Sequence, residues 1–240
     1  FFLKIWYTRF NQLNESEDIK MDILETMKVR HSVRQYKNQA IESSKREKIN
    51  ALIKDVNAES KLSIQVFYDE PKCFDSFMAH YGKFENVKNY IAIVGNKNDQ
   101  EKAGYYGEKI VLKCQKLGLN TCWVAMTHGK SKAQIKRGQK LLIIISLGYG
   151  ETQGVPHKSK SIAELGQADQ KNEWFEKGME AVSLAPTAVN QQKFYFELKN
   201  GIVTAKNLGG FYSRIDLGIV KYHFEAVTGH EVKQCRTLLS

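Results

Sequence analysis

The fold is decided by residues 90–126, which read YIAIVGNKNDQEKAGYYGEKIVLKCQKLGLNTCWVAM. The apolar run at 90–94 predicts a buried strand. Residues 104–117 then repeat apolar side chains at helical spacing, and Gly118 predicts the end of that helix. A second strand is expected at 121–126. Strand, helix and strand within one short stretch predict a domain that mixes both kinds of element, an α+β fold.

The same mixture of helix and strand continues on both sides of this stretch. Ser44 and Glu47 match a capping box and predict where a helix over 44–56 begins. Asn200 and Gly201 predict a two-residue hairpin turn, because both central residues of a type I′ turn need positive φ. The other expected helices lie at 23–30, 173–184 and 214–227, and the other expected strands at 62–68, 141–146, 194–198 and 202–205.

The order of these elements contains an internal repeat. Helix then strand at 45–68 resembles helix then strand at 173–198, and GYYG at 104–107 enters a helix as GFYS at 210–213 does. Two interpretations stay open. Either the chain contains two pseudo-repeats, at about 21–125 and 171–230, or the similarity reflects the common order of elements in α+β folds.

The 240 residues, with a mass of 27.5 kDa, fit one large domain or two small ones. Charges within residues 1–20 cancel, so the net charge of +10 belongs to residues 21–240. We therefore expect an N-terminal extension or leader at 1–20 and a folded domain that begins at Met21. The longest apolar run, 141–145, is far shorter than the ~20 residues of a membrane span, so no membrane partner is expected.

The basic charge raises the question of an anionic partner. No known nucleic-acid-binding motif is present, which favours a small anion over DNA or RNA. The cysteines, which are Cys73, Cys114, Cys122 and Cys235, form no CxxC pair and no zinc spacing with histidine. Unpaired thiols spread in this way predict a reducing, cytoplasmic location. Cys114 and Cys122 lie in apolar surroundings and are expected to be buried and inert.

Two basic segments offer groups that bind phosphate. The run RHSVR at 30–34 supplies two guanidinium groups, an imidazole and a hydroxyl, and alternate residues of an extended segment point to one side. Lys158 and Lys160 form a second alternating pair. The alternatives are a solvated basic helix end for the first segment and a solvated loop for the second. Composition leaves both alternatives open.

A loop at 185–192 is rich in small and polar residues. Its hydroxyl and amides suit close approach to a flat heteroaromatic ligand. The alternative is an ordinary loop in which Pro186 ends the preceding helix.

Two other patterns are interpreted as structural. Residues 148–154 nearly match the dinucleotide fingerprint GxGxxG, but Gln153 stands where the third glycine belongs, so we reject a Rossmann fold. His223 lies on the apolar face of the last helix and is expected to be a satisfied core histidine.

Taken in order, these segments resemble the FMN-dependent nitroreductase family, in its putative TM nitroreductase branch. No single match is specific, but the ordered set covers nearly all of residues 21–230. The segments are RHSVR at 30–34, YGKF at 81–84 through YIAIV at 90–94, GYYGE at 104–108, GLNTCW at 118–123, LGYG at 147–150, residues 185–192, DLGI at 216–219 and HF at 223–224.

The resemblance implies a fold, a cofactor and a set of contacts. It implies an α+β nitroreductase-like fold, in which helices wrap a mostly antiparallel sheet and FMN lies at a two-fold or pseudo-two-fold interface. It assigns Arg30, His31, Ser32 and Arg34 to the FMN phosphate and ribityl chain, and Lys158 and Lys160 to closing on the phosphate. It assigns Pro186, Thr187, Ala188, Asn190 and Gln192 to the loop over the isoalloxazine, and Trp123, Val124 and Ala125 to the strand end whose backbone N–H faces flavin N5.

Two departures from the family pattern bear on the site. The covering loop usually follows the basic segment within a few dozen residues, whereas here it lies far downstream, at 185–192. Ala188 also replaces a hydroxyl. The displaced loop and the internal repeat together suggest the hypothesis that one chain imitates the usual dimer and keeps one complete FMN site. A monomer built as a pseudo-dimer and a homodimer both stay open.

The implied activity is hydride transfer from NADH or NADPH through flavin N5 to an electron-poor small molecule, a nitroaromatic or a quinone. No side-chain general acid is required, in keeping with the lack of an obvious catalytic pair. Two alternatives stay open: an enzyme that consumes reduced FMN to make dimethylbenzimidazole, and a flavin-binding module without catalysis.

Overall fold

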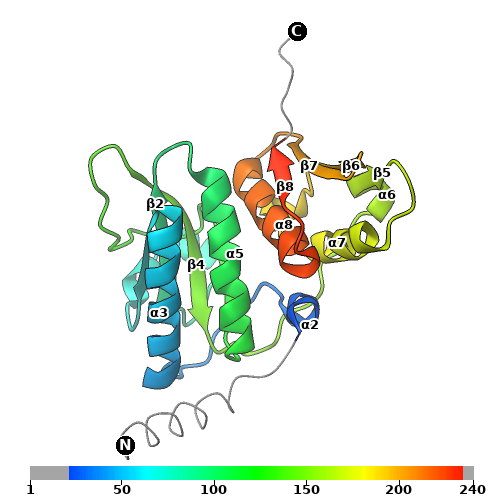
Figure 1. Cartoon of the computed structure of the whole chain (residues 1–240). Helices are drawn as coiled ribbons and strands as arrows, with labels where there is room; N and C mark the ends of the chain where they lie inside the picture. Colours follow the sequence, from blue (N-terminus) through cyan, green and yellow to red (C-terminus); the bar gives the residue numbers. More distant parts are fainter. Residues whose placement is uncertain (1–21, 235–240) are drawn as a thin grey trace, which may run out of the picture.

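The computed structural model describes residues 22–234, and the expected extension at 1–20 lies outside the described residues (Figure 1). The strands are β1 (Ser63–Phe67), β2 (Asn89–Gly95), β3 (Asn120–Val124), β4 (Lys140–Gly148), β5 (Gly166–Ala168), β6 (Phe194–Lys199), β7 (Ile202–Asn207) and β8 (Val232–Gln234). They form two four-stranded sheets, in the orders β1-β2-β4-β3 and β5-β6-β7-β8. The first sheet is antiparallel throughout, and the second pairs β6 with β7 antiparallel but adds β5 and β8 in parallel. The predicted α+β fold is confirmed, with the strands divided over two sheets instead of one.

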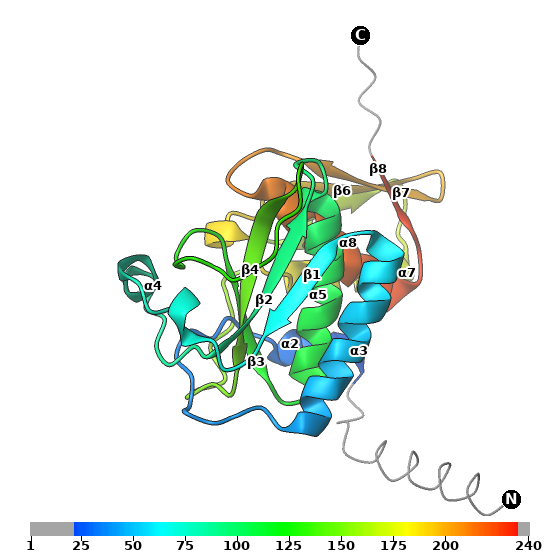
Figure 2. The same ribbon diagram turned by 90° about the vertical axis from the view of Figure 1, so that its left-hand side faces the viewer.

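The helices lie around and between these sheets. They are α2 (Ile23–Val29), α3 (Ser43–Ser60), α4 (Phe77–Tyr81), α5 (Gln100–Lys116), α6 (Ile162–Leu165), α7 (Glu173–Ser183) and α8 (Ser213–Thr228), with short 3₁₀ turns at Pro71–Cys73 and Ala188–Asn190. Figure 2 shows α3 and α5 side by side across one face of the first sheet. Helix α8 packs against α5 and against the second sheet, with α7 beside it. Helices α5 and α8 therefore form the layer that joins the two sheets.

Helices α5 and α8 cross at two glycines. A Cβ atom on Gly104 would overlap the carbonyl oxygen of Ile215, and a Cβ atom on Gly218 would overlap the carbonyl oxygen of Glu101. In each case the overlapped residue lies about one helical turn before the opposite glycine. The two backbones therefore touch directly, and the contact is reciprocal.

Local signals set most element boundaries where the sequence predicts them. Asn200 and Gly201 have φ values of 51° and 73°, as a type I′ turn requires, and they join β6 to β7. The expected capping box at Ser44 and Glu47 is wrong, because α3 begins one residue before Ser44 and no side chain caps it. The rejected dinucleotide fingerprint is followed by no helix before α6.

One continuous apolar core joins the two sheets. Strand β2 runs through the first sheet and is buried along its whole length. The largest cluster of buried apolar residues extends from Ile93 on β2 and Ile110 on α5 to Phe224 on α8 and Phe196 on β6. Within residues 22–234, no helix combines the length and the apolar character needed to cross a membrane.

Three buried polar side chains have the surroundings that the sequence predicts. The thiols of Cys114 and Cys122 are buried, and burial raises the pKa of each, to about 12 for Cys114. The buried His223 ring has Nδ1 2.8 Å from the carbonyl oxygen of Ala181 and Nε2 3.0 Å from the Glu108 carboxylate. Both thiols are therefore protonated and inert at neutral pH, and His223 is a satisfied core histidine.

Candidate functional site

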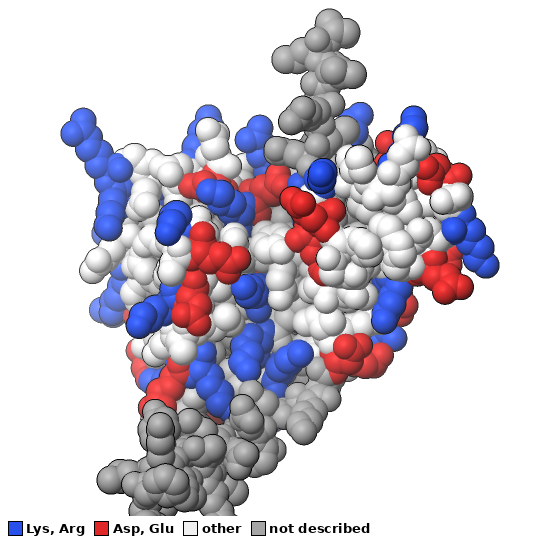
Figure 3. Space-filling model, in the orientation of Figure 1, with Lys and Arg blue, Asp and Glu red and all other residues white. Residues whose placement is uncertain are grey.

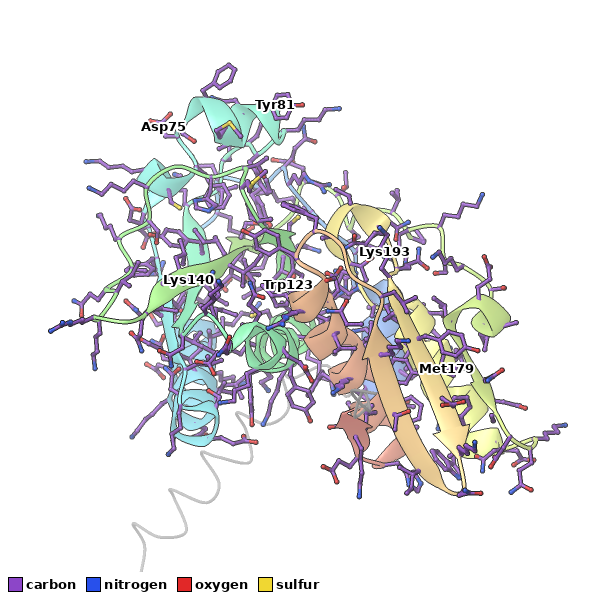
Figure 4. The ribbon with its side chains drawn as sticks, turned by 90° about the horizontal axis from the view of Figure 1, so that it is seen from above. Asp75, Tyr81, Trp123, Lys140, Met179 and Lys193 are labelled. Carbon is purple, nitrogen blue, oxygen red and sulfur yellow. The ribbon has the colours of Figure 1, made fainter. Side chains whose placement is uncertain are left out.

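A cavity of about 300 Å³ opens between the two halves of the chain, and both halves line it. The first half contributes Ser32, Arg34, Cys122, Trp123, Ala125, Met126 and Thr127, and the second contributes Pro186, Thr187, Ala188, Val189, Phe211, Ile215, Asp216 and Ile219. Figure 4 shows Trp123 in the middle of the molecule, between the two sheets. This largely apolar lining, with a few polar groups, suits a ligand that has a broad apolar face and polar edges.

The structure brings together predicted site residues from three separate segments. Ser32 and Arg34, Trp123 and Ala125, and the 186–188 stretch all line the cavity. Seven other predicted residues do not line it: Arg30, His31, Val124, Lys158, Lys160, Asn190 and Gln192. The strand expected at 121–126 ends at Val124, and the residues after it leave the sheet and turn along the cavity wall.

Ser32 and Arg34 are displayed by an extended segment that runs beside β3. The backbone N–H of Val33 donates to the carbonyl of Thr121 at 3.0 Å, and the Tyr36 hydroxyl donates to the carbonyl of Val33 at 2.8 Å. Because alternate residues of such a segment point to one side, Ser32 and Arg34 both reach the cavity. Arg34 is exposed and forms no ion pair within residues 22–234, which leaves its guanidinium free for an anion.

Arg30 does not share the cavity wall with Ser32 and Arg34. It is 2% exposed at the C-terminal end of α2, and its Nε lies 3.9 Å from Oε1 of Glu108. The buried carboxylate of Glu108 attracts the guanidinium inward, so the expectation that Arg30 points to the same side as its two neighbours is wrong. The Nε and Nη1 atoms of Arg30 are buried and have no hydrogen-bond partner.

Glu108 connects Arg30 to the cavity through Trp123. Its carboxylate accepts a hydrogen bond of 2.9 Å from the indole N–H of Trp123 and lies 3.0 Å from Nε2 of His223. Burial raises the pKa of Glu108, but the hydrogen bond and charge of His223 and the charge of Arg30 outweigh it and hold the pKa below its usual value. The ionised carboxylate therefore fixes the Trp123 indole in the cavity wall.

Other basic side chains gather near Arg30. Burial lowers the pKa of His31 and of His157, and the positive charge of Arg30 lowers both further. Gly154 brings the loop before His157 against His31, since a Cβ atom at Gly154 would lie 2.8 Å from the His31 Cβ and 3.1 Å from the Ser32 carbonyl oxygen. Two imidazoles from two segments thus lie near Arg30, and both are mainly neutral at neutral pH because their pKa values are lowered.

Lys158 and Lys160 meet the end of the 185–192 loop mainly through their backbones. The carbonyl oxygen of Lys158 accepts hydrogen bonds of 2.9 Å from the side-chain amides of Asn190 and Gln192. The Lys160 N–H donates to Oε1 of Gln192 at 2.8 Å. The side-chain amides of Asn190 and Gln192 therefore hold the two chain segments together, and Gln192 is buried, so both residues support the loop from the side of the 158–160 segment.

Asp216, in the first turn of α8, anchors the other part of this loop. Its Oδ1 accepts a hydrogen bond of 2.9 Å from the Ala188 N–H, and its Oδ2 accepts one of 2.7 Å from Nε2 of Gln191. Asp216 is 4% exposed, and burial raises its pKa to about 6.

Sequence reasoning gave no site role to several lining residues. These are Cys122, Met126, Thr127, Val189, Phe211, Ile215, Asp216 and Ile219. One sequence signal could have pointed to Ile215, Asp216 and Ile219 on α8: the carboxylate of Asp216 stands beside the apolar face of the last helix. Such a residue either caps a helix or fixes something that lies against it.

Comparisons with known proteins found a family model and several solved structures that are similar to this chain, and the family model and one structure support the fold. The family model described as Putative TM nitroreductase matches residues 22–228. Among solved structures, a putative nitroreductase from Thermotoga maritima MSB8 is 24% identical, with a TM-score of 0.66 and 91% of each chain covered. An FMN-dependent nitroreductase from Clostridium difficile R20291 is 22% identical, with a TM-score of 0.43 over 58% of this chain and 92% of that one. A putative nitroreductase in complex with FMN from Desulfovibrio desulfuricans is 16% identical, with a TM-score of 0.47 over 61% of this chain and 95% of that one. A search of curated proteins found no match.

Proposed function

The chain belongs to the putative TM nitroreductase family, and from this premise we propose that it is an FMN-dependent oxidoreductase. We infer that it passes hydride from NADH or NADPH through FMN to an electron-poor acceptor of the nitroaromatic or quinone class. The observation that carries the proposal is the cavity between the two halves, with a largely apolar wall and the unpaired guanidinium of Arg34 in it.

The residues at the site fit FMN in charge as well as in shape. Arg34 is free to pair with a phosphate, for which a guanidinium provides charge-assisted hydrogen bonds. Two buried nitrogens of Arg30 lack acceptors, and unsatisfied buried donors cost free energy. These nitrogens do not line the cavity, so the contact to a phosphate or ribityl chain is assigned to Arg34 and to the Ser32 hydroxyl, which do.

The chain's own residues bind, orient and shield in this proposal, and bound FMN would supply the hydride chemistry. Ala125 and Met126 follow the end of β3, and their backbone N–H groups have no hydrogen-bond partner within residues 22–234. The Tyr212 hydroxyl donates to the Ala125 carbonyl at 3.2 Å, which fixes this stretch of backbone. These N–H groups are the proposed partners of flavin N5, and the apolar side chains around them exclude water.

The proposed partner of the protein is a small molecule, and a nucleic acid is not proposed. Figure 3 shows acidic and basic side chains intermixed on the face that carries α5 and α8. Such a mixture does not favour a polyanion. Cys73, Cys114 and Cys122 are buried and unpaired, which suits a reducing compartment and supports a cytoplasmic location.

The test is the absorbance spectrum and flavin content of the purified protein, followed by assays of NADH and NADPH oxidation with a quinone and with a nitroaromatic. We expect a flavin band, one FMN per chain, and oxidation that needs the acceptor. A colourless protein that binds no added FMN would overturn the proposal. Destruction of FMN under air would favour the dimethylbenzimidazole-forming activity, and bound FMN without turnover would favour a non-catalytic module.

A further inference from the structure

The loop over the cavity holds an unfavourable backbone conformation. Val189, Asn190 and Gln192 have positive φ values of 47°, 53° and 46°. Left-handed backbone is uncommon for residues other than glycine, and for a β-branched residue such as valine it is a clear outlier. The loop therefore needs contacts from outside itself to keep this shape.

Two anchors supply these contacts. One is the 158–160 segment, which binds the side-chain amides of Asn190 and Gln192. The other is the carboxylate of Asp216, which binds the part of the loop nearer its start. Of the two anchors, Asp216 is the one that lines the cavity.

Asp216 acts on the loop as an acceptor of two neutral donors. The Ala188 N–H lies 2.9 Å from one of its oxygens and the Gln191 Nε2 lies 2.7 Å from the other. The same Gln191 nitrogen donates to the Phe211 carbonyl at 2.6 Å, so this amide cannot turn round without losing that bond. A carboxylate satisfies both donors at once, whereas an asparagine amide would present its own N–H to one of them.

Asp216 forms no ion pair within the described part of the chain. The charged groups on the surrounding elements are Arg34 in the same cavity wall, the exposed Arg214 on α8, and Glu101 and Lys102 on α5, which pair with Lys221 and Asp99 respectively. Cys122 shares the cavity wall and is protonated, and the Tyr212 hydroxyl is engaged by Ala125. Burial without a counter-charge raises the pKa of Asp216 to about 6, so an ionised carboxylate here lowers stability. A carboxylate kept at that cost while it fixes a strained loop indicates that the loop's position matters for function.

We propose that Asp216 is a positioning residue that locks residues 186–191 over the cavity and so sets how fast bound FMN leaves. The inference rests on the proposed function, because FMN is taken as the occupant. Asp216 holds the loop whether or not FMN is the occupant of the cavity. The proposed lock and the proposed function can therefore be tested separately. Asp216 transfers no proton in this role and acts through the loop.

The experiment compares Asp216→Ala and Asp216→Asn with Asp169→Asn as the matched control. Asp169 also accepts a backbone N–H, that of Asn200 at 2.8 Å, but it does not line the cavity. The first measurement is the rate at which FMN fluorescence recovers after dilution of the holoprotein. The second is the rate at which proteinase K cleaves the chain within 186–192, with and without FMN.

We expect FMN to leave Asp216→Ala about tenfold faster than wild type, because two hydrogen bonds to a charged acceptor are lost. Asp216→Asn should show a smaller increase, since it keeps one acceptor, and Asp169→Asn should show none. The loop should be cleaved faster in Asp216→Ala in both the presence and the absence of FMN. If Asp216→Ala does not fold, Gln191→Ala removes one of the two donors and should accelerate release by a smaller factor.

Wild-type release and cleavage rates in folded Asp216 variants would overturn the lock. A wild-type protein that binds no FMN would overturn the proposed function, and the cleavage rates would still decide about the lock. A fall in melting temperature with an unchanged FMN release rate would mean that Asp216 is merely structural, which would also overturn the inference.

Discussion

The candidate site is a cavity beside α8. A second cavity lies beside α5, on the other side of the point where α5 and α8 cross. The second cavity is larger, at about 1080 Å³, and is lined by α5, α8, β7 and β8. Because Gly104 and Gly218 make reciprocal contacts at the crossing, positions on the two helices correspond. The match of GYYG at 104–107 with GFYS at 210–213 is therefore wrong, because GYYG lies inside α5 and only GFYS precedes a helix. The corresponding lining residues are Glu101 and Ile215, Lys102 and Asp216, and Tyr105 and Ile219. The two cavities thus occupy equivalent places with different chemistry.

In the second cavity, charged and polar side chains pair with one another. The first cavity is instead lined mainly by apolar side chains. Lys221 pairs with Glu101, and the Tyr105 hydroxyl donates to Glu225 at 2.7 Å. The second cavity also lacks a counterpart of the covering loop. The connection between α7 and β6 contains residues 185–192, whereas the equivalent connection between α3 and β1 consists of Lys61 and Leu62 only. The second cavity therefore offers neither an apolar slot nor a lid for a flat ring.

This difference supports the hypothesis that one chain imitates a dimer and keeps one complete site. The order helix, strand, strand, helix is shared by α3-β1-β2-α5 and α7-β6-β7-α8, except that the first set has helix α4 and a 3₁₀ turn inserted between its two strands. We propose that these are the two pseudo-repeats expected at about 21–125 and 171–230, and that one FMN binds per chain. Two FMN per chain in the flavin assay would contradict this.

Replacing Gly218 with alanine should have the largest effect, because it breaks the crossing that relates the two cavities. The new Cβ would overlap the Glu101 carbonyl, which is backbone and cannot rotate away. We expect the free energy of unfolding to fall by about 3 kcal/mol, measured by urea denaturation, with loss of FMN binding. Lys54→Ala, at an exposed position of α3, is the control and should change neither. A G218A protein as stable as wild type would show that the crossing does not hold the halves together.

Asp216 should make stability depend on pH, since burial raises its pKa from 3.8 to about 6. Its folded-state pKa lies above its unfolded value, so its contribution to stability is fully present below about pH 4 and is lost as the pH rises through about 6. At about 1.4 kcal/mol per pKa unit, the loss amounts to roughly 3 kcal/mol. Urea denaturation between pH 4 and 7.5 should show the unfolding free energy of Asp216→Asn gaining on that of wild type by up to that amount. A difference that stays constant across this range would exclude a raised pKa at Asp216.

Replacing Arg34 with alanine should weaken FMN binding about tenfold, because one charge-assisted contact to the phosphate is lost. Lys233→Ala is the matched control, since Lys233 is an exposed cation that lines the second cavity. Titration of apoprotein with FMN, followed by flavin fluorescence, measures both. Equal affinities of the Arg34 and Lys233 variants would remove the distinction between the two cavities.

The sequence predicts elements whose signals are local. Residues 90–126 form the expected strand, helix and strand because apolar spacing and a glycine stop act within a few residues. The capping box predicted at Ser44 is wrong because α3 begins one residue before Ser44, which places Ser44 inside the helix and not at its cap. Local patterns thus fix the kind of element more firmly than its first residue.

Site residues could be predicted from the sequence only where the local segment alone determines that their side chains reach the cavity. Ser32, Arg34 and the 186–188 stretch reach the cavity as expected from their sequence segments. The burial of Arg30 depends on Glu108, and the role of Asp216 depends on Gln191, and each pair meets only after folding. Contacts between residues far apart in the chain carry no local pattern, so one chain's sequence does not reveal them.

The smallest effect should follow from Lys102→Ala, at the position on α5 that corresponds to Asp216. Lys102 pairs with Asp99 at 3.3 Å with more than half of its side chain exposed, and exposed pairs contribute about 0–1 kcal/mol. No covering loop lies over it, so its loss should leave FMN release unchanged, whereas loss of Asp216 speeds release. The two variants, compared in the same dilution assay, ask whether equivalent positions at the crossing have kept equivalent roles. Faster FMN release from Lys102→Ala would mean that the second cavity also holds the cofactor, and the model of one complete site per chain would have to be abandoned.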